Sequence, residues 1–543
     1  MNCWRIGIAM PSRCRVAPSN CGSTDKNSLR VLSSMRITNC AVKPFAAMKT
    51  LLLLCLTIST WPVLANHAAN YFESIKQDPV KLRQFLQQFP KGGDLHNHLS
   101  GAIYAESYLE WASADGKCID LNTYIITPPP CEGTKPLRQL MADTSTEPLE
   151  PVIDAMSTRN YERRGVSGHD QFFATFNRFR SAATGRFGDM VAEARQRAGR
   201  QNMVYLELML SLGMLEVTQL AAESGNLDAP YGERIDHTKV DTIVETVIEH
   251  FDAIEKRQSE LLGCTADADT QPTGCDVTVR YQAQVLRTFA PIQVYAQTLL
   301  AVKLMQADPR VVALNFVAPE DHRIALRDYH QHMQFVAELS AAFPSQPAGI
   351  TLHAGELTMG LVPPEDLGWH IRDAIETAGA TRIGHGIDIA YDDNMDALLN
   401  SMAEQDILVE INLTSNDVIL GIKDADHPLP TYLEYGVPVT LSTDDEGVSR
   451  IDLTHEYQRA TTTYDLSYLQ LRYFARNSLQ YSFLSGAPLF KDTADGRAIT
   501  ACATDDLGAV APSSNCAEFL AQSPKARLQW ELERRLSAFE ASF

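Results

Sequence analysis

Two histidines separated by one residue are the first candidates for chemistry in this chain. His96 and His98 lie in "GGDLHNHLSG", within a short run that has the character of a strand. Alternate side chains of an extended strand share a face, so both imidazoles would point the same way. Such a pair can hold a transition metal. The alternative is two polar side chains on the solvent side of a sheet, and the rest of the chain must decide between these interpretations.

Three later fragments place further polar groups at the ends of apolar runs. "LHAGE" supplies His353 and Glu356, "RIGHG" supplies His385, and "STDD" supplies Asp444 and Asp445. Two histidines from one strand, a third histidine and one carboxylate suit a Zn²⁺ site that keeps room for a water. A carboxylic acid beside it can protonate a substrate, and another histidine can orient or deprotonate the water. One strand-end histidine or one TDD turn is more often structural, but the four fragments together favour a zinc hydrolase.

Eight apolar, β-branched runs are expected to be the strands that position these groups. They alternate with amphipathic segments, which predicts parallel strands joined by helices. Eight such units predict an α/β fold, a closed (β/α)₈ barrel of the TIM type, whose active site lies at the carboxyl ends of the strands. The expected strands cover residues 92–99, 203–211, 276–286, 311–319, 348–356, 381–390, 406–416 and 437–445.

The fourth expected strand bears on the number of metal ions. A site with two metals would need a bridging acid or a modified Lys from a middle strand. The run "VVALNFVAPED" contains no Lys, and the apolar residues Phe316, Val317 and Ala318 stand at its end. The sequence therefore predicts one metal per chain.

Two segments interrupt the alternation of strands and helices. Residues 112–167 are rich in Pro and Thr and are expected to form an inserted loop subdomain near the barrel mouth. Residues 490–520 are expected to form a second surface excursion, followed by a C-terminal helix. Both contain a pair of cysteines.

The N-terminal region has the anatomy of an export signal. Residues 48–65, "MKTLLLLCLTISTWPVLA", combine one Lys, a continuous apolar run and a final small residue, as secretory signal peptides do. This run is too short for a good membrane span. We interpret residues 1–47 as a non-native or disordered extension, with Met48 as the true initiator. Residues 66–543 would then be one exported barrel domain, periplasmic or secreted, with no membrane attachment after cleavage.

The charge balance limits the classes of partner. The chain carries 47 Lys and Arg against 67 Asp and Glu, a formal net charge of −20. Residues 1–65 contain eight Lys or Arg and one Asp, so the exported chain would carry about −27. So acidic a protein is a poor partner for nucleic acid or anionic membranes.

Six cysteines follow the expected cleavage site, as three sequence-local pairs in loop-like stretches. Six cysteines permit fifteen connectivities, but local pairs favour pairing between neighbours. Zinc ligation is the alternative, and no C-x-x-C spacing among them supports it. We expect three disulfides, formed in an oxidising compartment: Cys118–Cys131, Cys264–Cys275 and Cys502–Cys516.

Taken in order, these motifs resemble the adenosine deaminase family of metal-dependent amidohydrolases. "FPKGGDLHNHLSGA" resembles the opening P-K-x-x-L-H-x-H-L-x-G of that family. "LHAGE", "RIGHG" and "STDD" resemble its motifs for the zinc His and catalytic Glu, for a histidine beside the metal, and for a terminal Asp pair. "SNDVILG" and "HPLPTYLEYGVPVTLSTDD" follow the family order as well. The signal peptide and the disulfide-bearing insertion resemble the secreted adenosine-deaminase growth-factor branch.

This resemblance implies one Zn²⁺ per chain, held by His96, His98, His353 and Asp444. Glu356 would protonate purine N1 as zinc-bound hydroxide attacks C6, His385 would hold or deprotonate the zinc water, and Asp445 would bond N7. Adenosine, and 2′-deoxyadenosine with it, would yield inosine or its deoxy form plus ammonia. The growth-factor branch also implies a homodimer paired through added N-terminal helices, to which residues 67–90 would contribute.

Three positions depart from the family pattern. Ser100 replaces an Asp that contacts the ribose 5′-hydroxyl in many members, Ala318 replaces a Gly whose backbone meets the purine, and Glu446 replaces a Pro. Ser100 and Ala318 would bind the substrate, so a 5′-modified adenosine or another aminopurine is the alternative substrate. A non-catalytic extracellular protein that binds nucleosides is the remaining alternative, and the presence of Glu356 and His385 argues against it.

Overall fold

The computed structural model describes the chain from Trp61, the first residue of α1 (Trp61–Ile75). The expected N-terminal extension, and the expected signal peptide as far as residue 60, lie outside the described residues. α1 continues past Ala65, after which cleavage was expected. The described ranges are 61–142, 149–223, 229–265, 271–344 and 349–543.

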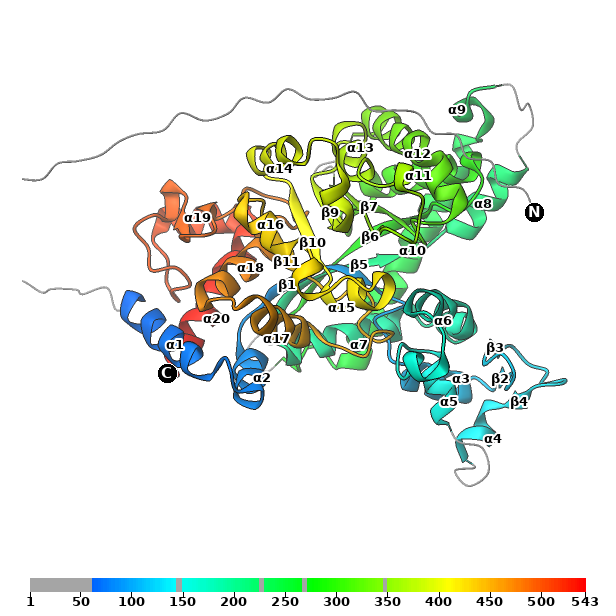
Figure 1. Cartoon of the computed structure of the whole chain (residues 1–543), viewed down its shortest axis with the longest axis horizontal. Helices are drawn as coiled ribbons and strands as arrows, with labels where there is room; N and C mark the ends of the chain where they lie inside the picture. The colour runs from blue at the N-terminus through cyan, green and yellow to red at the C-terminus, as the bar shows by residue number, and fades with distance from the viewer. Residues whose placement is uncertain (1–60, 143–148, 224–228, 266–270, 345–348) are drawn as a thin grey trace, which may run out of the picture. The chain divides into compact units, whose positions relative to one another are not determined.

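Eight parallel strands form a ring at the centre of the protein (Figure 1). Each strand pairs with the next one in the order β1-β5-β6-β7-β8-β9-β10-β11. An isolated bridge between Asn97 and Asp444, which lies just beyond the last strand, brings the two ends of this sheet together. The predicted (β/α)₈ barrel is therefore confirmed. Its strands are β1 (Gly92–His98), β5 (Met203–Leu210), β6 (Thr278–Leu286), β7 (Val311–Val317), β8 (Gly349–Ala354), β9 (Arg382–His385), β10 (Leu408–Ile411) and β11 (Val439–Leu441).

Most barrel strands are buried along their whole length, because helices cover their outer faces. β5 and β7 have no exposed residue, which is why they appear in the sequence as nearly continuous apolar runs. The last three strands are shorter than predicted. His385 and Asp444 adopt positive φ angles of 68° and 59°, and helical turns follow β9 and β10 at once. The chain thus leaves the extended conformation where the polar motifs begin.

Helices surround the barrel and connect successive strands (Figure 1). α10 shows how the sequence sets one of them. Asp236 caps its first turn by accepting hydrogen bonds from Thr238 and Lys239, and Gly263 ends it with a φ of 71°. The barrel helices are α7 (Phe187–Arg200), α8 (Met214–Ala222), α9 (Tyr231–Arg234), α10 (His237–Leu262), α11 (Pro291–Ala307), α12 (Arg323–Ala342), α13 (His370–Glu376), α14 (Met395–Glu404), α15 (Leu413–Ser415), α16 (Leu429–Glu434), α17 (Leu453–Tyr464) and α18 (Tyr468–Gln480).

The described part of the segment after β1 contains short strands and helices. Its three short antiparallel strands are tied by the Cys118–Cys131 disulfide. Helices and strands of this unit contact α6 (Gly168–Ala183), the helix that leads back to the barrel. Its elements are α3 (Ala105–Ala114), β2 (Cys118–Ile119), β3 (Ile126–Thr127), β4 (Lys135–Pro136), α4 (Leu137–Ala142) and α5 (Glu150–Ala155).

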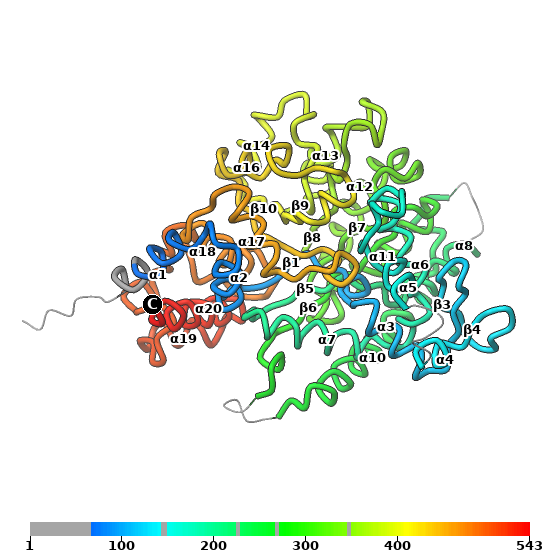
Figure 2. The backbone as a smooth tube through the Cα atoms, turned by 60° about the horizontal axis from the view of Figure 1, so that its bottom comes forward, coloured from blue at the N-terminus to red at the C-terminus, as the bar shows by residue number. Residues whose placement is uncertain are grey.

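The described N-terminal helices and the C-terminal helices lie side by side at one side of the barrel (Figure 2). Phe85 of α2 (Pro79–Gln88) packs edge-to-face on Phe539 of α20 (Pro524–Glu540), with ring centroids 4.9 Å apart. The C-terminal excursion contains β12 (Phe490–Asp492), β13 (Arg497–Ala498) and α19 (Ser514–Gln522). The other two predicted disulfides, Cys264–Cys275 and Cys502–Cys516, are also confirmed. No helix in the described ranges is long and apolar enough to span a bilayer.

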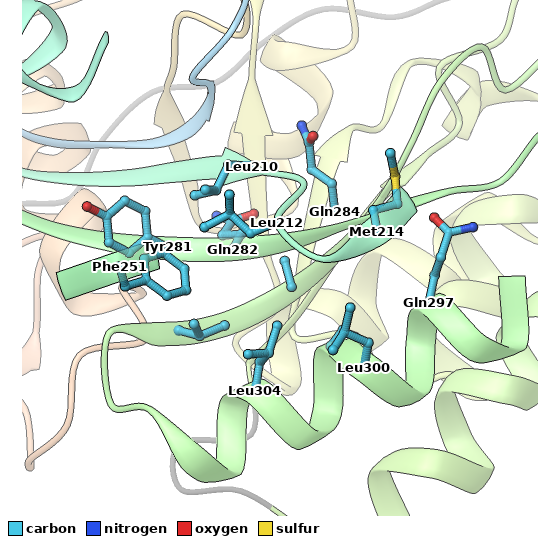
Figure 3. Close-up of a pocket in the computed structure, with 13 residues that line it drawn as sticks. Leu210, Leu212, Met214, Phe251, Tyr281, Gln282, Gln284, Gln297, Leu300 and Leu304 are labelled. Atoms are coloured by element: carbon cyan, nitrogen blue, oxygen red, sulfur yellow. The ribbon is translucent and has the colours of Figure 1, made fainter. Parts of the chain in front are cut away.

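A small cavity of about 20 Å³ separates the barrel wall from α11 (Figure 3). Leu300 and Leu304 of α11 line it together with Phe251 of α10 and Tyr281 of β6. Its volume is enough for about one water molecule and far too small for a nucleoside. Gln284 of β6 lines both this cavity and the much larger one described below.

Candidate active site

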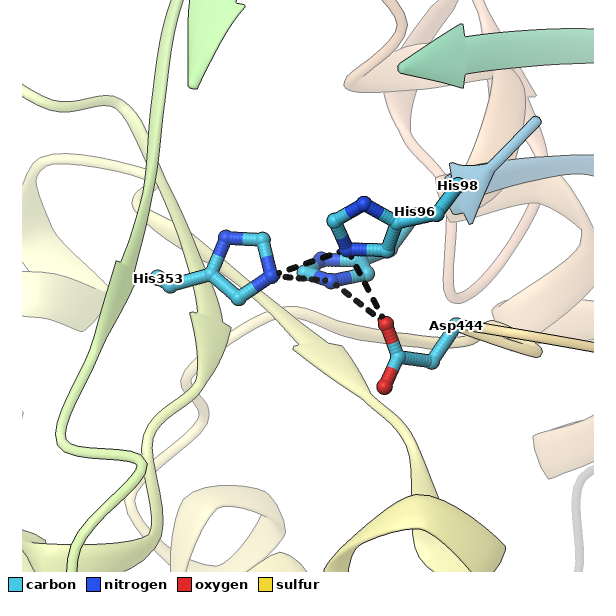
Figure 4. A group of neighbouring side chains, drawn as sticks. All are labelled: His96, His98, His353 and Asp444. Atoms are coloured by element: carbon cyan, nitrogen blue, oxygen red, sulfur yellow. Dashed lines mark hydrogen bonds and ion pairs between the residues drawn. The ribbon is translucent and has the colours of Figure 1, made fainter. Parts of the chain in front are cut away.

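Four predicted ligands converge at the carboxyl ends of β1, β8 and β11 (Figure 4). Nε2 of His353 lies 3.0 Å from Nε2 of His96 and 3.1 Å from Nε2 of His98. Oδ1 of Asp444 lies 3.4 Å and 3.2 Å from the same two His nitrogens. All four side chains are buried. The closing of the ring brings Asp444 to the histidines, because its backbone N–H donates to the carbonyl of His96 at 2.9 Å.

Interior polar residues fix two of the imidazoles. Oε2 of Glu410 accepts a hydrogen bond from Nδ1 of His96 at 2.6 Å, and Oδ1 of Asn315 accepts one from Nδ1 of His353 at 2.9 Å. Burial would raise the pKa of Glu410, but the positive charge of Arg382 and the bond to His96 lower it to about 2. Glu410 is therefore an acceptor. Both Nε2 atoms are left without a hydrogen and point into the cluster, as metal ligation requires.

His98 is held by Gln284, whose amide nitrogen lies 2.7 Å from Nδ1. The two ends of an amide side chain are nearly isosteric. With Nε2 on a metal, Nδ1 carries the hydrogen, so the amide oxygen of Gln284 must be the atom that faces it. Ser211, which contacts the other end of this amide at 2.7 Å, can accept as well as donate a hydrogen bond.

The two oxygens of the Asp444 carboxylate have different surroundings. The hydroxyl of Ser415 donates to Oδ2 at 2.6 Å, whereas Oδ1 has no hydrogen-bond donor among the described residues and faces the histidines. Lone pairs of His96, His353 and Asp444 thus meet in a buried space, an arrangement that is costly unless a cation joins them. Three imidazoles and one carboxylate are ligands that suit Zn²⁺. The donor set therefore fits a single metal ion.

Glu356 stands beside this cluster in an environment that favours its protonated form. Burial, together with the negative charge of Asp444, raises the pKa of Glu356 to about 8. The backbone N–H of Glu356 donates to Glu320 at 2.8 Å, which anchors the turn after β8. The guanidinium of Arg287 is buried next to both carboxylates. A carboxylic acid that is still protonated near neutral pH can act as a proton donor.

His385 and Asp445 occupy the remaining sides of the cluster. Nε2 of His385 lies 3.6 Å from Oε1 of Glu356 and has no hydrogen-bond partner among the described residues. Burial lowers the pKa of His385 to about 3, so the imidazole is neutral. Burial and the charge of Asp444 raise the pKa of Asp445 well above its usual range. Its carboxyl packs over Gly101, where a Cβ would lie 1.4 Å from Oδ1, so no other residue fits at that position.

A cavity of about 400 Å³ opens beside this cluster, and His98, His353 and Asp444 are among the residues that line it. One wall consists of Phe172, Phe173 and Phe176 of α6, and the ends of β6 and β7 add further apolar side chains, among them Leu286. Among the described residues that line it, none is a Lys or Arg. This lining suits a flat, uncharged aromatic ligand that presents a few polar atoms to the strand ends.

The three positions that depart from the family pattern have distinct surroundings. Ser100 and Ala318 line the cavity, as expected of residues that meet the substrate. Ala318 has a φ of 78°, a conformation that glycine adopts without strain. Glu446 lies outside the cavity lining and binds Arg197 at 2.9 Å and Gln201 at 3.0 Å, which fastens the end of the barrel to α7.

The predicted site residues thus lie together, but several of their partners were not identified from the sequence. Glu410 and Asn315 are single polar residues within otherwise apolar strands. This isolated polarity is the sequence feature that could have indicated a role inside the barrel. The Phe residues of α6 were interpreted only as part of a helix. Arg287 lies just after β6, and no local pattern distinguishes it.

Comparison with known proteins assigns the chain to one family. The model of the family described as adenosine deaminase matches residues 154–488. A curated adenosine deaminase of Escherichia coli O1:K1 is 43% identical over 137 residues, which cover 25% of this chain and 38% of that protein. The match therefore spans well under half of the relative's length.

Solved structures with a similar fold are more distant in sequence. An adenine deaminase from Arthrobacter aurescens is 17% identical, with a TM-score of 0.46 over 73% of this chain and 94% of its own. Arabidopsis ADAL, solved in complex with IMP, is 19% identical, with a TM-score of 0.49 over 74% of this chain and 94% of its own.

Proposed function

Because the chain belongs to the adenosine deaminase family, we propose that it is an exported, zinc-dependent adenosine deaminase. It would hydrolyse adenosine, and 2′-deoxyadenosine, to inosine or deoxyinosine and ammonia. The observation that carries this proposal is a cluster of four side chains that could hold a metal ion, beside Glu356, a carboxylic acid whose pKa is raised to about 8. The disulfides are compatible with an oxidising, extracytoplasmic compartment.

Each side chain then has a role at a stated atom of the purine. His96, His98, His353 and Asp444 would hold Zn²⁺, which would supply the Lewis acidity that makes water a nucleophile near neutral pH. Glu356 delivers a proton to N1 as water attacks C6, and His385 holds the attacking oxygen. Asp445, kept protonated by its raised pKa, donates a hydrogen bond to the lone pair of N7.

The cavity lining favours a nucleoside over a nucleotide. A phosphate at the 5′ position would need cationic side chains or several N–H donors to replace its hydration, and no Lys or Arg lines the described cavity. The aromatic side chains of α6 offer apolar surface to the nucleoside instead. Ser100 lacks the charge of the Asp found in many relatives, so 5′-modified adenosines are the alternative substrates.

A direct assay tests this proposal. Purified residues 66–543, with disulfides intact and zinc assayed in the same sample, would be incubated with adenosine and followed by ultraviolet absorbance. Conversion to inosine with about one zinc per chain is expected. Adenine, AMP, 2′-deoxyadenosine and 5′-deoxyadenosine form the comparison panel. Turnover of AMP or adenine in preference to the nucleosides would contradict the proposed substrate.

A further inference from the structure

A chain of three buried side chains leads from a backbone amide to His385. The N–H of Leu429 donates to Nδ1 of His427 at 3.0 Å. Nε2 of His427 lies 3.1 Å from Oδ1 of Asn416, and Nδ2 of Asn416 lies 2.9 Å from Nδ1 of His385. All three side chains are at most 2% exposed. None of them except His385 lies in the lining or the metal cluster.

The hydrogen bond from Leu429 to His427 determines which atom donates in each of the following hydrogen bonds. A backbone N–H can only donate, so Nδ1 of His427 must be a bare acceptor and its hydrogen must sit on Nε2. That hydrogen is donated to Asn416, whose oxygen therefore faces His427 and whose NH₂ group faces His385. Nδ1 of His385 then accepts, which leaves the hydrogen of the neutral imidazole on Nε2. A hydrogen on Nδ1 of His385 would point at the NH₂ of Asn416.

We propose that Asn416 and His427 are positioning residues that lock His385 in the Nε2–H tautomer. His385 then meets the attacking oxygen as a hydrogen-bond donor and has no free lone pair there to accept a proton. Its Nε2 is buried, lacks a partner among the described residues and lies 3.6 Å from Oε1 of Glu356, which is where this donor is needed. The inference rests on the proposed function, and it assigns His385 to holding the water rather than deprotonating it.

The polarity of this chain is opposite to that of a Ser-His-Asp triad. In the triad a carboxylate accepts the Nδ1 hydrogen and leaves Nε2 as a base. Here an amide donates to Nδ1 and leaves Nε2 as a donor. Asn416 follows Ser415, which binds Asp444, so two adjacent residues orient a candidate metal ligand and the neighbouring histidine. Both lie where helix α15 passes into a π-helical turn over Asn416–Leu420, a geometry often found at functional sites.

The substitution Asn416→Asp tests the lock with almost no change of shape. The new carboxylate accepts from both imidazoles, so the hydrogen of His385 should move to Nδ1. Nitrogen NMR of histidine-labelled protein distinguishes the two tautomers, and the His385 signal is assigned by its absence in His385→Gln. We expect the Nε2–H form of His385 in the wild type and the Nδ1–H form in Asn416→Asp, with the same zinc content in both proteins. In Asn416→Asp, kcat should fall at least about 100-fold and KM should change less than about threefold, since the inverse exchange in a serine-protease triad costs about 10⁴ in kcat.

A matched pair at His427 separates tautomer control from packing. Gln at this position can accept from Leu429 through its oxygen and donate to Asn416 through its nitrogen, whereas Phe can do neither. His427→Gln should keep the Nε2–H form and most of kcat, and His427→Phe should lose both. Equal loss in the two variants would overturn the proposal.

The wild-type spectrum decides the proposal even if a variant fails to fold. An Nδ1–H form of His385 in the wild type would overturn the lock. An Nε2–H form in a protein that deaminates none of the substrate panel would refute the proposed function and still support the lock.

Discussion

The guanidinium of Arg287 lies 4.0 Å from the carboxyl group of Glu356, measured from Nη2 to Oε2. Arg287 is held by the carbonyls of Ala318 at 2.8 Å and His353 at 3.1 Å, while Nη2 has no hydrogen-bond partner among the described residues. A fixed cation beside an acid favours its ionised form. Arg287 therefore lowers the pKa of Glu356, whereas burial and the charge of Asp444 raise it.

This pair predicts an alkaline limit to activity. Glu356 must be protonated to act as an acid, and its raised pKa is about 8. The protonated fraction is complete well below that value and falls about tenfold per pH unit above it. A plot of kcat/KM against pH should descend at or below about pH 8, because a bound cation offsets the charge of Asp444. Arg287→Met should move this descent to higher pH, and a descent at the same pH in both proteins would contradict the assignment.

Glu356→Gln should separate chemistry from metal binding. The amide has nearly the same shape but cannot give up a proton in this pH range, so kcat should fall by a factor of about 10² to 10⁴. Zinc content, measured by elemental analysis, should stay at the wild-type level. His353→Ala is the matched control and should lose zinc. Loss of zinc from Glu356→Gln would show that this residue is a ligand.

Ala318→Gly should stabilise the protein. The φ of 78° at Ala318 costs a residue with a Cβ about 1 to 2 kcal/mol, whereas the added freedom of glycine in the unfolded chain costs about 0.5 to 1 kcal/mol. We expect a net gain of up to about 1 kcal/mol in the free energy of unfolding, measured by urea denaturation. Ala313→Gly, within the preceding strand β7 and fully buried without a positive φ, should be destabilising instead. A loss of stability in both variants would show that the conformation of Ala318 carries no strain.

Removal of the last disulfide should weaken the C-terminal excursion without changing the chemistry. Cys502 and Cys516 are fully buried in a small core with Leu489, Phe490 and Trp530, separate from the main core of the barrel. Closing a loop of this length stabilises a fold by about 3 kcal/mol. The double substitution to Ser should lower the unfolding temperature and leave kcat/KM for the confirmed substrate unchanged. Lost activity in a folded variant would connect this region to the site.

The sequence could indicate which candidate ligands lie together, because their placement depends on a simple geometric rule. His96, His353 and Asp444 lie at or near the carboxyl ends of their strands, and parallel strands in a barrel bring these ends together. The strand count followed from apolar runs alone. Contacts between Glu410 and His96 depend instead on register across the ring, which local patterns do not encode. The wall formed by the Phe residues of α6 depends on where the insertion places that helix, and this too is a tertiary property.

The closing seam of the barrel has a consequence for when the metal can be acquired. Asp444 joins His96 and His98 only after the end of the last strand has met the first strand, with all the other barrel strands between them in sequence. Such long-range pairing is a late event in folding, so a nascent chain cannot complete the ligand set before residue 444 has emerged. Metal binding should therefore be the last step of folding, and the ion should come from the compartment in which folding ends. A chelator should then increase the rate at which the contact between the first and last strands opens.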